Sequence, residues 1–417
     1  MIMREQILSN AIDAHDRLVA ALLFLLGLTL PILPAAIPLF IVCLVLAMLY
    51  RHRPIAWHGA DRDFKRSVLP WTFVLYFIHV IGMAWTTNMG FGLFDLEIKF
   101  SLALFPLLFL LIPKDSRRGG EIVQIGFILG NALVVPICAL PAAYETLTDV
   151  DIHWDQRFIA SYFSLFLHPT YASLYMCMAL AMLYFGSGIP GVGAVRRRLI
   201  AVVLIIGVVL MASKMAWFAL LLLVVQIMVA KWTDRAMRRE AAVALAGALI
   251  ALGALLMFSE FAAERIREMG SVIAGWRVEG AGENSSGLRL MAWEAATEVF
   301  RSAPLTGAGT GDVKDELMKI YEARGYMSAF EQKLNAHSQF LQTAAALGLI
   351  GLIPLIGCLL VPLFHAIREA DHLSISFIGL LLLNWTVESM IEVQAGVIFV
   401  AVIGLSLVMR SVRSSHP

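Results

Sequence analysis

Residues 199–230 read LIAVVLIIGVVLMASKMAWFALLLLVVQIMVA, two apolar runs that meet at a single charged residue, Lys214. A helix needs about 20 apolar residues to cross the hydrocarbon core of a bilayer, and both runs approach that length. Three arginines (196–198) precede the first run, and Lys231 follows the second. Basic residues favour the cytoplasmic side of a membrane. The stretch therefore predicts two membrane helices whose basic ends lie in the cytoplasm and whose junction at Lys214 lies on the opposite side.

The composition of the whole chain is also strongly apolar. Of its 417 residues, 59% are hydrophobic and 15% are charged, and the mean hydropathy is +0.79. A soluble domain has about 45–50% apolar and 25% charged residues. So large an apolar excess excludes both a water-soluble globule and a disordered chain, and the net charge of +1 excludes bulk attraction to nucleic acid. We expect an all-α polytopic membrane protein surrounded by membrane lipids.

The apolar runs predict twelve spans, several of them short: 18–32, 34–50, 69–86, 97–113, 121–143, 162–186, 197–212, 214–230, 240–258, 337–363, 372–388 and 391–410. Pro31 and Pro34 divide the first pair, and residues 212–214 divide the seventh span from the eighth. Most Lys and Arg residues fall in the connections on the side of the N-terminus. The chain is therefore expected to be multi-pass with both termini cytoplasmic.

One stretch, 259–336, is long and polar. We expect three parts: transmembrane helices 1–9 at 1–258, a periplasmic loop at 259–336, and helices 10–12 with a short cytoplasmic tail at 337–417. Within the loop, apolar residues recur at helical spacing over 266–276. Residues 285–287 (SSG) resemble a helix start, and Pro304 with the following glycines ends that helix. The loop is expected to rest as a cap on the outer surface of the bundle.

Charged residues on the outer side are candidates for function, since the positive-inside tendency disfavours them. Lys214 has almost no loop to carry it into water; the alternative is a snorkelling lysine near a helix end. For Arg157 the alternative is an interfacial anchor. For Lys99 the alternative is pairing with the nearby Asp95 and Glu97.

Arg289 and His337 are stronger candidates for functional residues. Arg289 lies in SGLRLMAW (286–293), on the helix that leads to APLTGAG (303–309), and His337 lies in NAHSQFLQ (335–342) at the mouth of the tenth span. Imidazole is a suitable acid or base near neutral pH. The alternative is an interfacial histidine whose hydrogen bonds are satisfied.

These stretches resemble the O-antigen ligase and polymerase superfamily. Residues 337–342, followed by Gly348 and Gly351, are similar to its histidine signature. Residues 289–309 are similar to the Arg-x-x-x-Trp and Pro-x-x-Gly-x-Gly pattern that precedes it. Residues 157–171, with a His-Pro pair, and 388–396 match further elements in the same order. Lys214 departs from the arginine that is usual in the family, keeping the charge but losing the planar fork.

The resemblance implies a glycosyltransferase C-like fold and transfer of a glycan from undecaprenyl diphosphate to the lipid A core. It places the reaction on the periplasmic face of the bacterial inner membrane, without a metal or other cofactor and with inversion at the anomeric carbon. Such a transfer needs a base for the acceptor hydroxyl and cations around the diphosphate. On this basis His337 is the expected base and Arg289 is catalytic. The expected diphosphate ligands are Lys214, Arg265 and Arg157, with support from Gln339, His168 and Glu388. For Gln339 the two interpretations are contact with sugar hydroxyls and packing, and for Glu388 they are the balancing of buried positive charge and a second role as base.

Three alternatives remain. A polymerase would use the same donor with a second lipid-linked glycan as acceptor, and a protein-glycosylating ligase would use a protein side chain. One large loop and a short C-terminal tail favour the lipopolysaccharide ligase. A lipid-linked glycan transporter would show repeated halves, and none is evident.

The acidic residues and histidine at 149–155 have spacing that suits calcium, but a solvated loop is the preferred interpretation.

Overall fold

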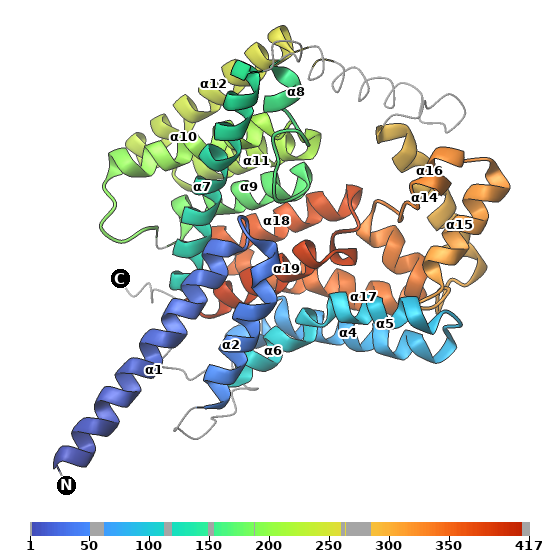
Figure 1. The fold of residues 1–417 in the computed structure, drawn as a ribbon, viewed down its shortest axis with the longest axis horizontal. Coiled ribbons are helices and arrows are strands. Elements are labelled where there is room, and N and C mark those ends of the chain that lie inside the picture. The colour runs from blue at the N-terminus through green and yellow to red at the C-terminus, as the bar shows by residue number, and fades with distance from the viewer. Residues whose placement is uncertain are drawn as a thin grey trace.

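The computed structural model describes residues 2–50, 62–111, 119–148, 154–186, 188–259, 263 and 285–410. Within these residues all regular secondary structure is helical (Figure 1). The all-α prediction is confirmed for the described chain.

Each of the twelve predicted spans contains an apolar helix. These helices are α1 (Ile2–Thr29), α2 (Ile37–Leu49), α4 (Leu69–Gly82), α6 (Ser101–Leu111), α7 (Gly119–Thr148), α9 (Pro169–Phe185), α10 (Ala194–Leu210), α11 (Lys214–Ala230), α12 (Arg235–Phe258), α17 (Gln339–Arg368), α18 (His372–Val387) and α19 (Gln394–Val408). Among the described residues, three helices are long and apolar enough to cross a membrane: α7, the Arg238–Phe258 part of α12, and α17. The fold favours a multi-pass membrane protein, whereas the count of twelve crossings and the side of each terminus stay predictions.

The two predicted breaks between neighbouring spans are confirmed. α1 ends at Thr29, and the 3₁₀ turn η1 (Pro34–Ala36) leads into α2. Proline lacks an N–H and fits best in a first helical turn, which explains this break. Between α10 and α11 the chain turns at Ala212, which has a positive φ of 47°.

The predicted spans at 97–113 and 162–186 each contain a stretch before their main helix that the structure shows to be separate from it. The span at 97–113 is divided into α5 (Met89–Lys99) and α6, because Phe100 bonds to the carbonyl three residues back and a new helix starts after it. The span at 162–186 becomes helical only at Pro169. His168 is extended, with ψ 139°, as expected for a residue that precedes proline.

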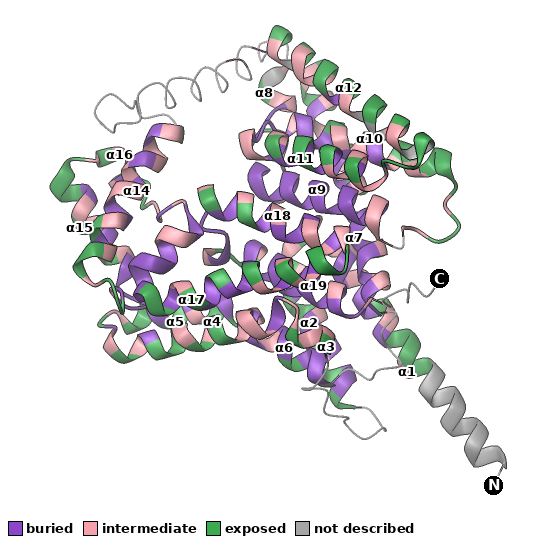
Figure 2. Ribbon diagram, turned by 180° about the vertical axis from the view of Figure 1, so that it is seen from behind, coloured by how far each residue is buried: buried purple, intermediate pink, exposed green. Residues whose placement is uncertain are grey.

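The outer surface of the bundle is rich in large apolar side chains. Leu39, Ile250 and Ile353 are 62%, 72% and 67% exposed on three different helices. Figure 2 shows α12 largely exposed, whereas α9 and α19 are buried in the middle of the molecule. An apolar exterior of this extent suits contact with lipid acyl chains rather than water.

The helices α14 (Ser285–Ser302), α15 (Val313–Arg324) and α16 (Met327–Glu331) form a cap with a small core of its own. Ala296 of α14 and Tyr321 of α15 are fully buried in it together with Leu347 of α17. Figure 1 shows the cap at one end of the bundle, far from the start of α1. The helix predicted from residue 285 is confirmed, whereas the periodic stretch at 266–276 lies outside the described residues.

The glycine-rich loop after α14 fastens the cap to α17. Ala308 and Gly309 donate backbone hydrogen bonds of 2.9 Å to the carbonyls of Ala345 and Ala346. α17 is interrupted at Gly348, whose φ of 61° and ψ of −153° are not helical. A Cβ atom there would lie 2.4 Å from the carbonyl carbon of the facing loop, so glycine is required for this close approach. The Pro-x-x-Gly-x-Gly pattern thus has a structural role.

Asp312 ties the same loop to the start of α5. Its carboxylate accepts hydrogen bonds from the backbone N–H of Thr87 (2.8 Å) and Asn88 (2.7 Å). Burial alone would raise the pKa of Asp312, but these hydrogen bonds outweigh it and lower the pKa below the usual value. The cap is therefore anchored on two sides, by α17 and by α5.

Candidate active site

His337 lies immediately before α17 in a left-handed conformation, with φ 44°. This conformation is uncommon for a residue with a side chain and costs about 1–3 kcal/mol. Neighbouring groups hold it: the Asn335 side chain accepts from the His337 N–H (3.0 Å), and Trp293 Nε1 donates to the His337 carbonyl (3.1 Å). Strain fixed from both sides is typical of a functional position.

Glu388 lies just beyond the end of α18, between His337 and Arg289. Its Oε1 accepts from Nη2 of Arg289, and its Oε2 lies 3.4 Å from Nδ1 of His337. The second contact is electrostatic rather than a well-directed hydrogen bond, since Nδ1 has no hydrogen-bond partner in the described part of the chain. The imidazole therefore turns Nδ1 toward the carboxylate and Nε2 away from it.

The environment keeps Glu388 ionised. Burial alone would raise its pKa, but the His337 imidazole and the Arg289 guanidinium outweigh burial and lower the pKa to about 2. A permanent negative charge beside Nδ1 favours the tautomer with the proton on Nδ1 and leaves Nε2 as the acceptor. It would also stabilise the imidazolium that forms when Nε2 takes up a proton.

Arg289 lies in the second turn of α14 and holds the end of α18. Nε donates to the Val387 carbonyl (3.1 Å), and Nη2 donates to Glu388. Nη1 donates to the Ser285 carbonyl (3.2 Å) on the exposed side of the helix. Nε and Nη2 therefore hold the end of α18 in place, and Nη1 is the nitrogen that can face a ligand.

Lys214 begins α11 and reaches the first turn of α14, where its Nζ donates to Oγ of Ser286 (3.1 Å). Ser286 is one helical turn before Arg289, so the two cations flank the N-terminus of α14. A helix N-terminus presents backbone N–H groups and a partial positive charge. The ends of α11, α14, α17 and α18 therefore converge on one site with basic and acid–base groups.

An apolar groove of about 200 Å³ leads away from Lys214 between α11 and α12. Its walls are formed by Trp217, Phe218 and Leu221 of α11 and by Leu245 and Leu249 of α12, with further aliphatic side chains. A single ammonium group at the end of an apolar groove is suited to a ligand with an anionic head and a hydrocarbon tail.

The other predicted site residues lie elsewhere. Arg157 forms an ion pair with Glu145 at the end of α7 rather than joining the Arg289–Glu388–His337 cluster. The His168 side chain accepts from the Thr170 N–H at the start of α9, which is a capping role. Arg265 lies outside the described residues, as do the acidic positions 149 and 151 of the possible calcium loop.

Gln339 is fully buried and its amide is occupied. Nε2 donates to Thr343 (3.2 Å) and to Glu392 (3.3 Å), and Oε1 accepts from the Ile391 N–H (2.8 Å). Of the two interpretations weighed for this residue, the structure favours packing over contact with sugar hydroxyls.

Sequence reasoning missed Glu392 as a partner of Lys99. Lys99 Nζ donates to Asp95, as considered above, and also to Glu392 at 2.8 Å. Glu392 in turn meets Gln339, two residues after His337. Lys99 and Asp95 are buried and Glu392 is partly buried, so this network supports the segment that carries Glu388. A spacing of four residues between Glu388 and Glu392 was the only signal in the sequence.

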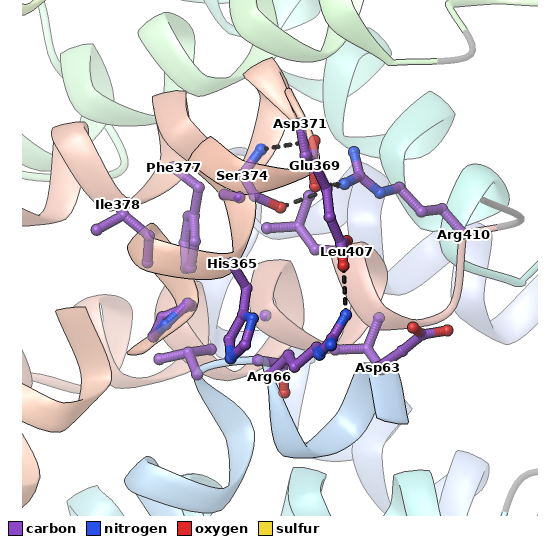
Figure 3. A pocket seen from close by; sticks show the side chains of 16 residues that line it. Asp63, Arg66, His365, Glu369, Asp371, Ser374, Phe377, Ile378, Leu407 and Arg410 are labelled. Atoms are coloured by element: carbon purple, nitrogen blue, oxygen red, sulfur yellow. Dashed lines mark hydrogen bonds and ion pairs between the residues drawn. The ribbon is translucent and has the colours of Figure 1, made fainter. Parts of the chain in front are cut away.

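A second polar cluster lies at the other end of α17 and α18 (Figure 3). Arg66 pairs with Glu369, and Arg410 pairs with Asp371 and with Ser374 (3.2 Å). The cavity between them has a volume of about 80 Å³. We call this set, with Asp63 and His365, the Arg66–Arg410 cluster. The part of the chain that is described contains no group of three or more His, Cys, Asp or Glu arranged to hold a metal ion.

Residues 199–356 match the family model described as O-antigen ligase. The matched stretch contains Lys214, Arg289 and His337 and ends before Glu388. No curated protein matches the chain. Ligases and polymerases of this family transfer lipid-linked glycans. The resemblance inferred from the sequence is thereby confirmed: residues 199–356 carry an O-antigen ligase family domain.

Proposed function

We propose that this protein is an O-antigen ligase that transfers a glycan from undecaprenyl diphosphate to a sugar hydroxyl of the lipid A core. The observation that carries the proposal is the Arg289–Glu388–His337 cluster beside Lys214. It supplies a positioned imidazole and cations at one place, and the reaction requires both. By the predicted topology, this place is on the periplasmic face of the inner membrane.

In the proposed reaction Nε2 of His337 accepts the proton of the acceptor hydroxyl. The hydroxyl oxygen forms a bond to the anomeric carbon from the face opposite the diphosphate. The bond from that carbon to the diphosphate oxygen breaks, and its electron pair leaves with the diphosphate, so the configuration is inverted. The Glu388 carboxylate stabilises the imidazolium that results.

The donor is assigned to the N-terminus of α14. Lys214 and Nη1 of Arg289 flank this terminus, and both favour a diphosphate. The apolar groove at Lys214 would take the start of the polyprenyl chain. No step of this scheme uses a metal ion, so transfer is expected to proceed in the presence of EDTA.

The test is a reconstituted assay with the purified protein, undecaprenyl diphosphate-linked glycan and rough lipopolysaccharide, run with EDTA. Glycan attached to the lipid A core is the expected product. Longer lipid-linked glycan without core attachment would instead assign the protein to the polymerases. Transfer to a protein acceptor would support the protein ligase, and movement of intact donor across the bilayer would support the transporter. Activity lost in EDTA and restored by magnesium or calcium would contradict the metal-free mechanism.

A further inference from the structure

A polar groove of about 400 Å³ runs between α14 and α15 on the cap. We call it the α14–α15 groove, and its polar lining consists of Trp293, Glu294, Thr297, Glu298, Arg301 and Arg324. Five of these residues belong to α14, at positions 293, 294, 297, 298 and 301. Steps of three or four residues return to the same side of a helix, so all five share one face of α14. The volume lies within the range of ligand-binding pockets, about 300–1,000 Å³.

Trp293 joins this groove to the candidate base. Its ring lines the groove, and its Nε1 donates to the His337 carbonyl at 3.1 Å. Arg301 is eight residues further along α14, which corresponds to about 12 Å at 1.5 Å per residue. The groove therefore begins beside His337 and continues away from it along the cap.

The charges in the groove cancel. Arg324 Nη2 donates to Glu298 (2.9 Å) and Nη1 lies 3.6 Å from Glu294, which also accepts from Tyr326 (2.9 Å). Arg301 brings the second positive charge and forms no ion pair with any residue in the described ranges. Two carboxylates and two guanidinium groups give no net attraction for an ion, but they offer many planar hydrogen-bonding groups.

An indole ring beside paired carboxylates and guanidinium groups suits a sugar chain. A pyranose ring has an apolar face of C–H bonds that can stack on an aromatic ring, and its hydroxyls can donate to carboxylates and accept from guanidinium groups. The groove contrasts with the one at Lys214, where the lining is almost wholly apolar. A lipid tail fits the Lys214 groove, and a polyhydroxylated ligand fits the α14–α15 groove.

We propose that the α14–α15 groove binds the sugar chain of the acceptor, with one ring stacked on Trp293 so that the next hydroxyl meets His337. This inference rests on the proposed function for the identity of the acceptor. The donor head group is assigned to the first turn of α14, at Ser286, and the groove extends from Trp293 in the opposite direction. The base therefore lies between the two, as transfer from one to the other requires.

The test measures binding without donor, so that it does not depend on turnover. The full-length protein in lipid nanodiscs is titrated with the delipidated oligosaccharide from the rough lipopolysaccharide of the transfer assay. The double variant Arg301→Ala/Glu298→Gln is expected to raise the Kd at least tenfold. The matched control Lys319→Ala removes an exposed charge of α15 that pairs with Glu316 and does not line the groove, and its Kd should equal the wild-type value.

Transfer kinetics separate the groove from the catalytic centre. The double variant should raise the KM for acceptor about tenfold and leave the kcat at saturating acceptor and the KM for donor unchanged. Trp293→Phe keeps a stacking ring but loses the donor to the His337 carbonyl, so it should lower kcat more than it changes the KM for acceptor.

The outcomes distinguish this inference from the proposed function. An unchanged oligosaccharide Kd in the double variant would overturn the acceptor groove, even if the wild-type protein transfers glycan normally. Oligosaccharide binding that the double variant weakens would support the groove, even if the wild-type protein transfers no glycan to lipid A core. In that case only the ligase assignment would fail.

Discussion

The two polar clusters at opposite ends of α17 and α18 contain the same kinds of residue but pair them differently. In the Arg66–Arg410 cluster each arginine has a carboxylate of its own, Glu369 or Asp371. In the other cluster a single carboxylate, Glu388, serves both an arginine and a histidine. The ends are separated by the 30 residues of α17, about 45 Å of helix.

The backbone differs as well. His365 lies within the regular part of α17, whereas His337 has a left-handed backbone held by neighbouring side chains. A fully paired cluster on regular helix can be explained by fastening helices together. A strained histidine whose ring Nδ1 makes no hydrogen bond to any described residue is not explained in this way, because its side chain fastens no helices together through a directed hydrogen bond. Strain together with incomplete pairing therefore distinguishes the candidate active site from the other cluster better than the presence of charges does.

The largest effect is expected when the histidines near the two ends of α17 are compared. His337→Ala should lower kcat by about 10²- to 10⁴-fold, the usual contribution of a general base, while expression and donor binding remain. His365→Ala is the matched control at the other cluster and should transfer glycan at the wild-type rate. Both variants are compared in the reconstituted transfer assay. A His337→Ala protein with normal turnover would show that the cluster at His337 is no more catalytic than the cluster at His365.

The two glutamates provide the next comparison. Glu388→Gln removes the charge that orients His337, an interaction of about 1.5–3 kcal/mol, and should lower kcat about 10- to 100-fold. Glu369→Gln should leave kcat unchanged and lower only the unfolding temperature, because it breaks the Arg66 pair. Equal kcat values for the two variants would argue against a special role for Glu388.

The low pKa of Glu388 predicts how the stability difference between wild type and Glu388→Gln depends on pH. Its pKa of about 2 lies below the usual value, so the stabilising effect of its charge is fully present above about pH 4.5 and is lost as the pH falls toward 2. The difference in unfolding temperature between wild type and Glu388→Gln should therefore be at least as large at about pH 5 as at about pH 8. A smaller difference at about pH 5 would show that Glu388 titrates between these values and is not held ionised.

A smaller effect is expected where the cap is fastened to α17. Gly348→Ala should cost about 2–4 kcal/mol, because the left-handed backbone is strained and the new methyl group would overlap the facing loop. Gly379→Ala in α18 meets no atom within 4 Å and should be neutral or slightly stabilising. Thermal unfolding in detergent measures both. If Gly348→Ala were as stable as Gly379→Ala, the close contact between loop and helix would be refuted.

The smallest effect is expected at Lys214. Lys214→Arg keeps the positive charge, restores the residue usual in the family, and should change the KM for donor less than about threefold. Lys214→Met, which has a similar length without charge, serves as the control and should raise that KM at least tenfold. An inactive Lys214→Arg protein would mean that the site needs the compact ammonium group contacting Ser286.

Much of the fold and part of the site could be predicted from the sequence. Apolar runs of helical length located the helices, because lipid contact leaves few polar residues in them. Residues Lys214, Arg289 and His337 were evident as polar groups on the outer side, and the structure brings Lys214 to the first turn of the helix that carries Arg289.

The rest depends on contacts that no local pattern encodes. Lys99 and Glu392 are 293 residues apart in the chain, so their pairing follows only from packing. Nothing in the sequence marks a positive φ at His337, since the residue is not glycine and tertiary contacts impose the conformation. Arg157 was assigned by order along the chain, and the structure instead pairs it with Glu145.

The most direct test of His337 as the base is chemical rescue. The variant His337→Gly removes the imidazole and suits the left-handed backbone, so the start of α17 should keep its shape. Its glycan transfer is measured with and without added imidazole, with Glu388 intact. We expect transfer near the detection limit without imidazole and a rate that rises with imidazole concentration. Wild-type transfer without imidazole would contradict a base at this position.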